Sequence, residues 1–178
     1  ARFGSDAQNP VAKLFWGRVA MDWATSGFVF EREGKLQKLI HDLKYRGISE
    51  AGHELGRMLG EELINNNLND SDVIIPVPMH KAKKRTRGYN QAEIIAGGLA
   101  EVLNVEVRDD ILVRKHNTAS QTKKGRVSRW KELESVFETN NTCSIRGKVL
   151  LVDDVITTGA TLEAVSYTHL TLPTSPHV

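Results

Sequence analysis

Two neighbouring carboxylates, Asp153 and Asp154, stand between an apolar run at 149–152 and a loop rich in threonine and glycine at 157–161. Ionised carboxylates only accept hydrogen bonds, so an adjacent pair suits two neighbouring hydroxyls of a sugar ring. The loop supplies backbone N–H groups and threonine hydroxyls, and its glycine permits a left-handed turn that brings the backbone close to a ligand. This order of residues therefore indicates a site for a sugar phosphate.

The elements that must position these groups can be predicted from the flanking residues. Residues 149–152 are all apolar, which is typical of a parallel strand buried on both faces. Open α/β sheets bind ligands outside the carboxyl ends of their strands, where the two aspartates would then lie. Residues 162–164 fit the first turn of a helix, and a helix N-terminus attracts an anion.

The rest of the chain alternates between strand and helix patterns. Short apolar runs predict strands at 28–31, 72–78 and 111–113, and apolar residues at helical spacing predict helices at 34–45, 50–65 and 90–103. The helix at 50–65 would bury Leu55, Met58, Leu59 and Leu63 on one face, and Asn90 with Glu93 resembles a capping box. This alternation predicts an α/β domain with a mainly parallel central sheet flanked by helices.

A basic segment follows the predicted strand at 72–78. Five Lys or Arg residues fall between 81 and 87, of which Lys84, Arg85 and Arg87 are the candidate site residues. Basic side chains and backbone amides at a strand end could bind a polyanion such as pyrophosphate. The alternative is a solvated basic loop without a ligand.

A second basic segment, 114–130, is polar and contains a glycine, which suits a lid over an anionic substrate. Its candidate ligand contacts are Lys123, Lys124 and Arg126. The alternative is a surface linker whose charges only keep the protein in solution.

Composition excludes several classes of protein. A length of 178 residues suits one domain, and a net charge of +2 gives no overall basic field for nucleic acid. Cys143 is the only cysteine, which rules out a disulfide framework or a cysteine-based zinc site within one chain. No histidine pair has metal-ligand spacing, and neither Gly-Lys pair has the earlier glycine of a P-loop. With no apolar run of ~20 residues and no signal pattern, we expect a cytoplasmic protein without a membrane segment.

Both ends of the chain look cut. The first residue is Ala1, and the helical pattern that begins at 162 does not continue beyond Val165. We expect residues 166–178 to be a non-native tail, with a genuine short strand and Pro-rich end as the alternative. The predicted division is an N-terminal segment at 1–27, a domain at 28–165 and this tail.

Residues 149–161 resemble the signature with which type I phosphoribosyltransferases bind 5-phosphoribosyl-1-pyrophosphate (PRPP). The resemblance implies that Asp153 and Asp154 hold the 2′ and 3′ hydroxyls of the ribose. It also implies that the 5′-phosphate is held by Thr157, Thr158, Gly159, Ala160 and Thr161.

Further residues narrow the resemblance to the ComF/GntX-like branch of that family. Pro76-Val77-Pro78, the run 87–91, Thr118 with Gln121, Arg126 or Arg129, and Phe137 resemble that branch in order, so the likeness covers about residues 28 to 165. Two departures stand out: many relatives carry an N-terminal zinc module, and the family continues beyond the PRPP helix with another strand. The resemblance therefore implies a type I phosphoribosyltransferase-like fold that is truncated at its C-terminus and lacks the zinc module.

The resemblance implies a glycosyltransferase that acts on PRPP or a related phosphosugar, with Mg²⁺ held mainly by the substrate. The acceptor and the oligomeric state do not follow from the sequence. The alternative is a non-catalytic adaptor in DNA uptake that binds a phosphosugar, single-stranded DNA or a competence helicase. Five Phe, three Tyr and three Trp offer few rings for stacking on bases, which disfavours a broad single-strand platform.

Overall fold

The computed structural model describes residues 9–19, 21–27, 49–115, 136–140, 145 and 147–166. The strand predicted at 28–31, the helix predicted at 34–45, most of the expected lid and residues 167–178 lie outside this part. In chain order the elements are α1 (Pro10–Lys13), α3 (Ser49–Asn65), β1 (Val73–Pro76), α4 (Lys81–Arg87), α5 (Gln91–Leu103), β2 (Glu106–Val107), β3 (Leu112–Arg114), β4 (Phe137–Thr139), β5 (Val149–Val152) and α7 (Ala160–Ser166).

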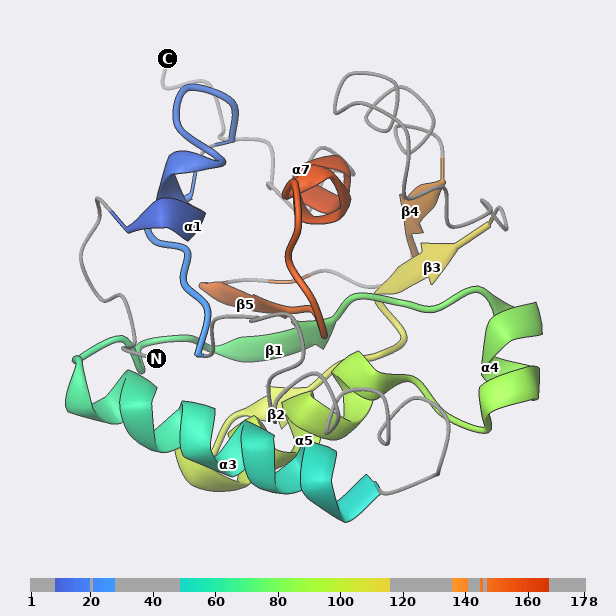
Figure 1. The fold of residues 1–178 in the computed structure, drawn as a ribbon, viewed down its shortest axis with the longest axis horizontal. Helices are drawn as coiled ribbons and strands as arrows, with labels where there is room; N and C mark the ends of the chain where they lie inside the picture. The colour runs from blue at the N-terminus through green and yellow to red at the C-terminus, as the bar shows by residue number, and fades with distance from the viewer. Residues whose placement is uncertain are drawn as a thin grey trace, which may run out of the picture.

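The central sheet has the strand order β2-β1-β5, and both pairings are parallel. Val73 lies opposite Val149 and Pro76 opposite Val152, so β1 and β5 end at the same edge. Figure 1 shows α3 and α5 on one side of this sheet and α1 and α7 on the other. The predicted α/β architecture with a parallel sheet is confirmed, and β3 pairs with β4 in a separate antiparallel sheet.

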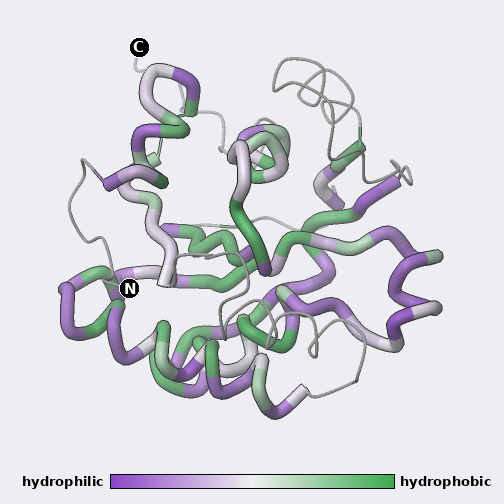
Figure 2. The backbone as a smooth tube through the Cα atoms, in the orientation of Figure 1, coloured by the Kyte–Doolittle hydropathy of each residue, from purple (hydrophilic) through white to green (hydrophobic). Residues whose placement is uncertain are grey.

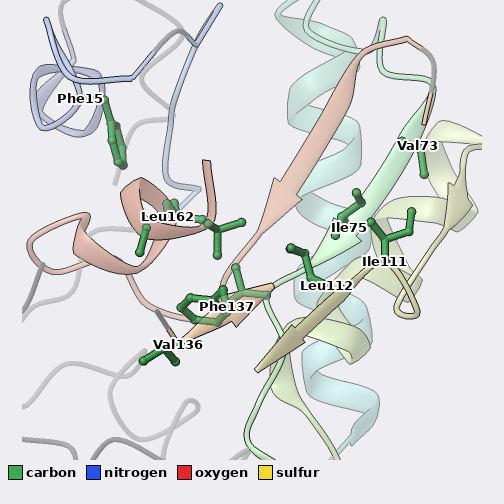
Figure 3. Close-up of a cluster of buried hydrophobic side chains, with 11 residues drawn as sticks. Phe15, Val73, Ile75, Ile111, Leu112, Val136, Phe137 and Leu162 are labelled. Carbon is green, nitrogen blue, oxygen red and sulfur yellow. The ribbon is translucent and has the colours of Figure 1, made fainter. Parts of the chain in front are cut away.

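Alternating side chains of β1 enter two hydrophobic cores, one on each face of the sheet. Ile75 joins the α7-side core, which also contains Phe15, Val73, Val77, Ile111, Leu112, Val136, Phe137, Leu162, Ala164 and Val165. Ile74 joins the α5-side core, which also contains Leu63, Ile95, Ala96, Leu99, Leu150 and Val152. Figure 3 shows much of the α7-side core, with Phe15 beside the helix that carries Leu162. Burial on both faces holds the strand ends rigidly beneath the predicted site.

Helices α3 and α5 pack through glycine rather than through large side chains. A Cβ atom at Gly56 would lie 2.1 Å from the carbonyl oxygen of Ile95, and one at Gly98 would lie 2.0 Å from that of His53. The buried side of α3 is therefore centred on its glycines, with Leu55 and Leu63 beside them. The predicted burial of Met58 is wrong, because that side chain turns away from this contact and is 45% exposed.

Four elements are absent from the sequence prediction: α1, α4, β2 and β4. The side chain of Asn9 caps α1 and Pro10 opens it, a pair that is a known helix-start signal. Strand β2 is only two residues long and lies at the sheet edge, so it leaves no alternating pattern to detect. Among the helices that the structure describes, none is long and apolar enough to cross a lipid bilayer.

Candidate functional site

The carboxyl ends of β1 and β5 are joined where the acidic pair begins. The backbone N–H of Val77 donates to the carbonyl oxygen of Val152 at 2.8 Å. The buried side-chain amide of Asn90, the N-cap of α5, donates to the carbonyl oxygen of Val77 at 2.9 Å. Asp153 and Asp154 follow directly and are partly buried. They thus lie at the edge of a parallel sheet where open α/β folds bind ligands.

A hollow of about 70 Å³ opens beside the acidic pair. Its lining consists of Asp153 and the residues that follow β5: Val155, Ile156, Thr157, Thr158, Gly159, Ala160, Thr161 and Leu162. A single water needs about 10–15 Å³ by this measure, so the hollow can accept a group of several atoms, such as a phosphate. One carboxylate and the whole Thr/Gly loop therefore face the same space, whereas Asp154 adjoins it without being part of the lining.

Local hydrogen bonds fix the shape of this loop. The backbone N–H of Asp154 donates to Oδ1 of Asp153 at 2.9 Å, which orients that carboxylate. Gly159 has a φ of +75°, in the left-handed region, so its lack of a Cβ matters here. The N–H of Glu163 donates to the carbonyl oxygen of Gly159 at 2.9 Å, and α7 begins at Ala160. The turn therefore passes straight from the hollow into the helix.

The basic segment at 81–87 is a helix, α4, so the solvated loop that was the alternative to a pyrophosphate-binding segment is not what forms there. The Nδ1 atom of His80 accepts from the N–H of Ala82 at 3.2 Å to cap its start. Gly88 ends it in the left-handed conformation with a φ of +87°. The sequence of this segment has no apolar residues at helical spacing from which a helix could be predicted. Only the two capping residues, His80 and Gly88, indicate where it begins and ends.

The three candidate basic residues of this helix have different surroundings. Both carboxylate oxygens of Glu93 accept from the Nζ atom of Lys84 at 2.8 Å, so much of the charge of Lys84 is already balanced. Arg87 donates to the side chain of Gln91 at 3.4 Å, and Arg85 is exposed. The other three candidates, Lys123, Lys124 and Arg126, lie outside the described residues.

Two further cations, Lys83 and Arg114, interact with each other, and neither is among the candidate residues selected from the sequence. Burial lowers the pKa of Lys83, and the positive charges of Arg114 and Arg87 lower it further. Burial also lowers the pKa of Arg114, while the carboxylate of Asp153 acts in the opposite direction. The guanidinium carbon of Arg114 lies 5.3 Å from the ring centre of Phe137, which holds the side chain in place. Lys83, Arg87 and Arg114 are here called the basic cluster, and Arg114 is the member that interacts with the carboxylate of Asp153.

The donor set suits a magnesium ion shared with a substrate. Among the residues that the structure describes, no three His, Cys, Asp or Glu side chains gather into a complete metal site. Mg²⁺ commonly binds through one or two carboxylates together with substrate phosphates and waters. The carboxylates of Asp153 and Asp154, beside an open hollow, fit that pattern.

Comparison with known proteins gives consistent matches. The family model for the phosphoribosyl transferase domain matches residues 89–170, which include the acidic pair and the Thr/Gly loop. Competence protein F of Haemophilus influenzae is 36% identical over 142 residues, covering 78% of this chain and 57% of that protein. Competence protein ComFC of Bacillus subtilis is 34% identical over 134 residues, covering 75% and 53% respectively.

A third group of relatives has a different name. DNA utilization protein YhgH of Escherichia coli is 29% identical over 136 residues, covering 74% of this chain and 59% of that protein. The chain therefore spans slightly more than half the length of the curated relatives it matches. No solved structure matches it at a significant level.

Proposed function

Because this chain carries a phosphoribosyl transferase domain of the ComF family, whose members include the competence and DNA utilization proteins, we propose that it binds PRPP beside Asp153 and transfers the phosphoribosyl group. The observation that carries the proposal is the shared hollow. One carboxylate and all five residues of the loop 157–161 line it together. A ribose 5-phosphate has hydroxyls that suit the carboxylate and a phosphate that suits the loop.

Each end of the ribose has a group suited to it. The carboxylates of Asp153 and Asp154 accept hydrogen bonds from the 2′ and 3′ hydroxyls, and charged acceptors make these bonds stronger than neutral ones. Backbone N–H groups and hydroxyls of residues 157–161 donate to the 5′-phosphate. The hydrogen bond from the N–H of Asp154 to Asp153 supports the first contact, because it fixes the carboxylate before the ligand arrives.

The basic cluster faces the pyrophosphate in this proposal. Lys83 and Arg114 are partly buried, and the positive charge of Arg114 contributes to lowering the pKa of Lys83. A pyrophosphate at this edge of the sheet would favour the charged form of Lys83. Lys84, Arg85, Lys123, Lys124 and Arg126 remain proposed contacts, although Lys84 would first have to leave Glu93.

Asp153 and Asp154 would hold magnesium together with the substrate, and the ion would supply positive charge against the charge that develops on the leaving pyrophosphate. The chain itself positions the ribose and surrounds the departing anion with cations, which are the main contributions expected of such a site. No side chain of the described site stands out as a base for the acceptor, so the acceptor class is left open.

Pyrophosphate release from PRPP, measured against a panel of amines and nucleobases, tests this function. We expect release with at least one acceptor and none from a protein carrying both Asp153→Asn and Asp154→Asn. Thermal unfolding adds a test independent of turnover, because PRPP with Mg²⁺ at 100 times its Kd stabilises the folded state by about 2.7 kcal/mol. If the double variant keeps the full activity and the full stabilisation, the site is wrongly assigned.

One observation favours a second function, binding of single-stranded DNA as part of DNA uptake. Helix α4 contains five basic residues and no acidic one, and Lys81 and Arg85 are exposed on it. Figure 2 shows this helix as largely hydrophilic at the side of the molecule. Relatives are named competence and DNA utilization proteins, which suits such a role.

Salt dependence separates the two functions. Binding of an oligonucleotide through α4 should weaken steeply with salt, and replacing both Lys81 and Arg85 with glutamine should reduce the log–log slope by roughly 1.4, about 0.7 for each phosphate that is no longer neutralised. Lys81→Gln alone, which leaves the proposed pyrophosphate contact Arg85 in place, should reduce the slope by roughly 0.7 and leave PRPP binding unchanged. If oligonucleotide binding has the same salt dependence in the parent and in the variant with both substitutions, α4 is not part of the DNA-binding surface.

A further inference from the structure

The side chain of Asn9 connects two parts of the N-terminal segment 9–27, in which residue 20 lies outside the described residues. The Oδ1 atom of Asn9 accepts from the N–H groups of Val11 and Ala12 at 2.9 Å each, which starts helix α1. Its Nδ2 atom donates to the carbonyl oxygen of Ala24 at 2.9 Å. Residues at the two ends of the segment are thereby tied to each other. It can therefore pack against the rest of the domain as one piece.

This piece packs against the back of the proposed phosphate loop. Phe15 is only 3% exposed and belongs to the α7-side core. A Cβ atom on Gly159 would lie 3.0 Å from both Cε1 and Cζ of Phe15, and 3.5 Å from Cβ of Leu14. The ring is thus in direct contact with the one loop residue that adopts a left-handed conformation. Figures 1 and 3 show α1 and Phe15 alongside α7.

A second contact joins the same two parts of the chain. Arg18 forms an ion pair with Glu163 at 2.9 Å, and the side chain of Glu163 is 5% exposed. The N–H of Glu163 also donates to the carbonyl oxygen of Gly159. Because a buried carboxylate is unfavourable without a cationic partner, Arg18 holds the first turn of α7 in place. Phe15 and Arg18 therefore hold the loop at its glycine and at its junction with the helix.

We propose that the N-terminal segment 9–27 is a structural part of the phosphoribosyl site, with Phe15 and Arg18 as positioning residues for the loop 157–161. Neither side chain lines the hollow, so neither contacts the ligand directly. Their effect comes from ordering the loop before the phosphate arrives, since a site ordered in advance loses less entropy on binding. This inference rests on the proposed function and assigns to the N-terminal segment a role that its sequence did not reveal.

Affinity for ribose 5-phosphate, measured by titration calorimetry, tests the proposal. Phe15→Ala should raise the Kd by roughly 10- to 100-fold because the loop is no longer held in the binding shape. Phe15→Leu should recover much of the affinity. Leu63→Ala is the matched control, since Leu63 is also 3% exposed but lies in the α5-side core. Leu63→Ala should lower the free energy of unfolding but leave the Kd within about twofold of that of the parent. A side chain that only stabilises the fold does not change the binding site of the molecules that remain folded.

Arg18→Gln provides a second route if Phe15→Ala does not fold, and it should also raise the Kd. Trp16→Ala, a change at a neighbouring side chain that is 56% exposed, should not. Folded variants of Phe15 and Arg18 that bind ribose 5-phosphate like the parent would overturn the proposal.

A ligand-free measurement separates this inference from the proposed function. In amide hydrogen exchange, Phe15→Ala should accelerate exchange in residues 157–161 but not in α5, which packs on the opposite face of the sheet. Unchanged exchange in the loop would refute the positioning role. A parent protein that binds neither PRPP nor ribose 5-phosphate would refute the proposed function instead, while the exchange result would still decide whether the segment orders the loop.

Discussion

Replacing Gly159 with alanine should damage the protein in two separable ways. The residue has a φ of +75°, and a side chain in the left-handed region costs about 1–2 kcal/mol. The new methyl group would also lie 3.0 Å from two ring atoms of Phe15, which is buried and has little room to move. Overpacking of this kind costs typically about 1–3 kcal/mol. The expected loss in the free energy of unfolding is therefore about 2–5 kcal/mol.

Gly17 offers a matched control for the backbone effect. Its φ is +67°, close to that of Gly159, yet nothing lies within 4 Å of a Cβ placed there. Gly17→Ala should therefore lose only the conformational part, about 1–2 kcal/mol. The difference between the two variants measures the contact between the loop and Phe15.

Urea unfolding of both variants gives the comparison directly. The variant with both Phe15→Ala and Gly159→Ala should lose less stability than the sum of the two single losses, because the ring that meets the new methyl group is gone. The reasoning is refuted if Gly159→Ala costs no more than Gly17→Ala, or if the two changes at Phe15 and Gly159 are simply additive.

Three further predictions concern other parts of the molecule. Gly98→Ala should destabilise the α3–α5 contact by more than about 2 kcal/mol in urea unfolding, whereas Gly97→Ala, whose Cβ would be 3.6 Å from the nearest atom, should be neutral or slightly stabilising. Arg114→Gln should weaken pyrophosphate binding in calorimetry by roughly tenfold or more, and the exposed Lys115→Gln should not. Pyrophosphate should raise the lowered pKa of Lys83, so binding at a pH between that pKa and the ordinary 10.5 should take up protons, seen as a heat that depends on the buffer. Equal losses of stability for Gly98→Ala and Gly97→Ala, or equal losses of affinity for Arg114→Gln and Lys115→Gln, would contradict the first two predictions. A heat of pyrophosphate binding that does not depend on the buffer would contradict the third.

Strands β1, β3 and β5 and helices α3, α5 and α7 followed from local sequence patterns, whereas β2 and β4 did not. The apolar run at 149–152, the prolines at and after the end of β1 and the N-cap at Asn90 are local signals, and the structure has the expected element at each. A mainly parallel sheet was expected from strands alternating with helices and from apolar runs typical of strands buried on both faces, but the pairing of β1 with β5 was not predicted.

Contacts between distant segments could not be read in this way. The burial of Met58 was predicted from helical spacing, but glycines at the α3–α5 contact decided which side of α3 is covered. The basic segment at 81–87 is a helix because of its two caps, which a run of like charges conceals. Arg114 and Lys83 meet only after the chain folds, and no spacing in the sequence relates them.

The central claim is most directly tested by titration calorimetry with three ligands: PRPP with Mg²⁺, ribose 5-phosphate and inorganic phosphate. The parent should bind all three, and the protein carrying Asp153→Asn and Asp154→Asn should lose at least about tenfold in affinity for both sugar phosphates, as expected when charged hydrogen bonds are removed. Its affinity for inorganic phosphate should stay unchanged, because the loop 157–161 is intact. Equal binding of PRPP by the two proteins would contradict the account.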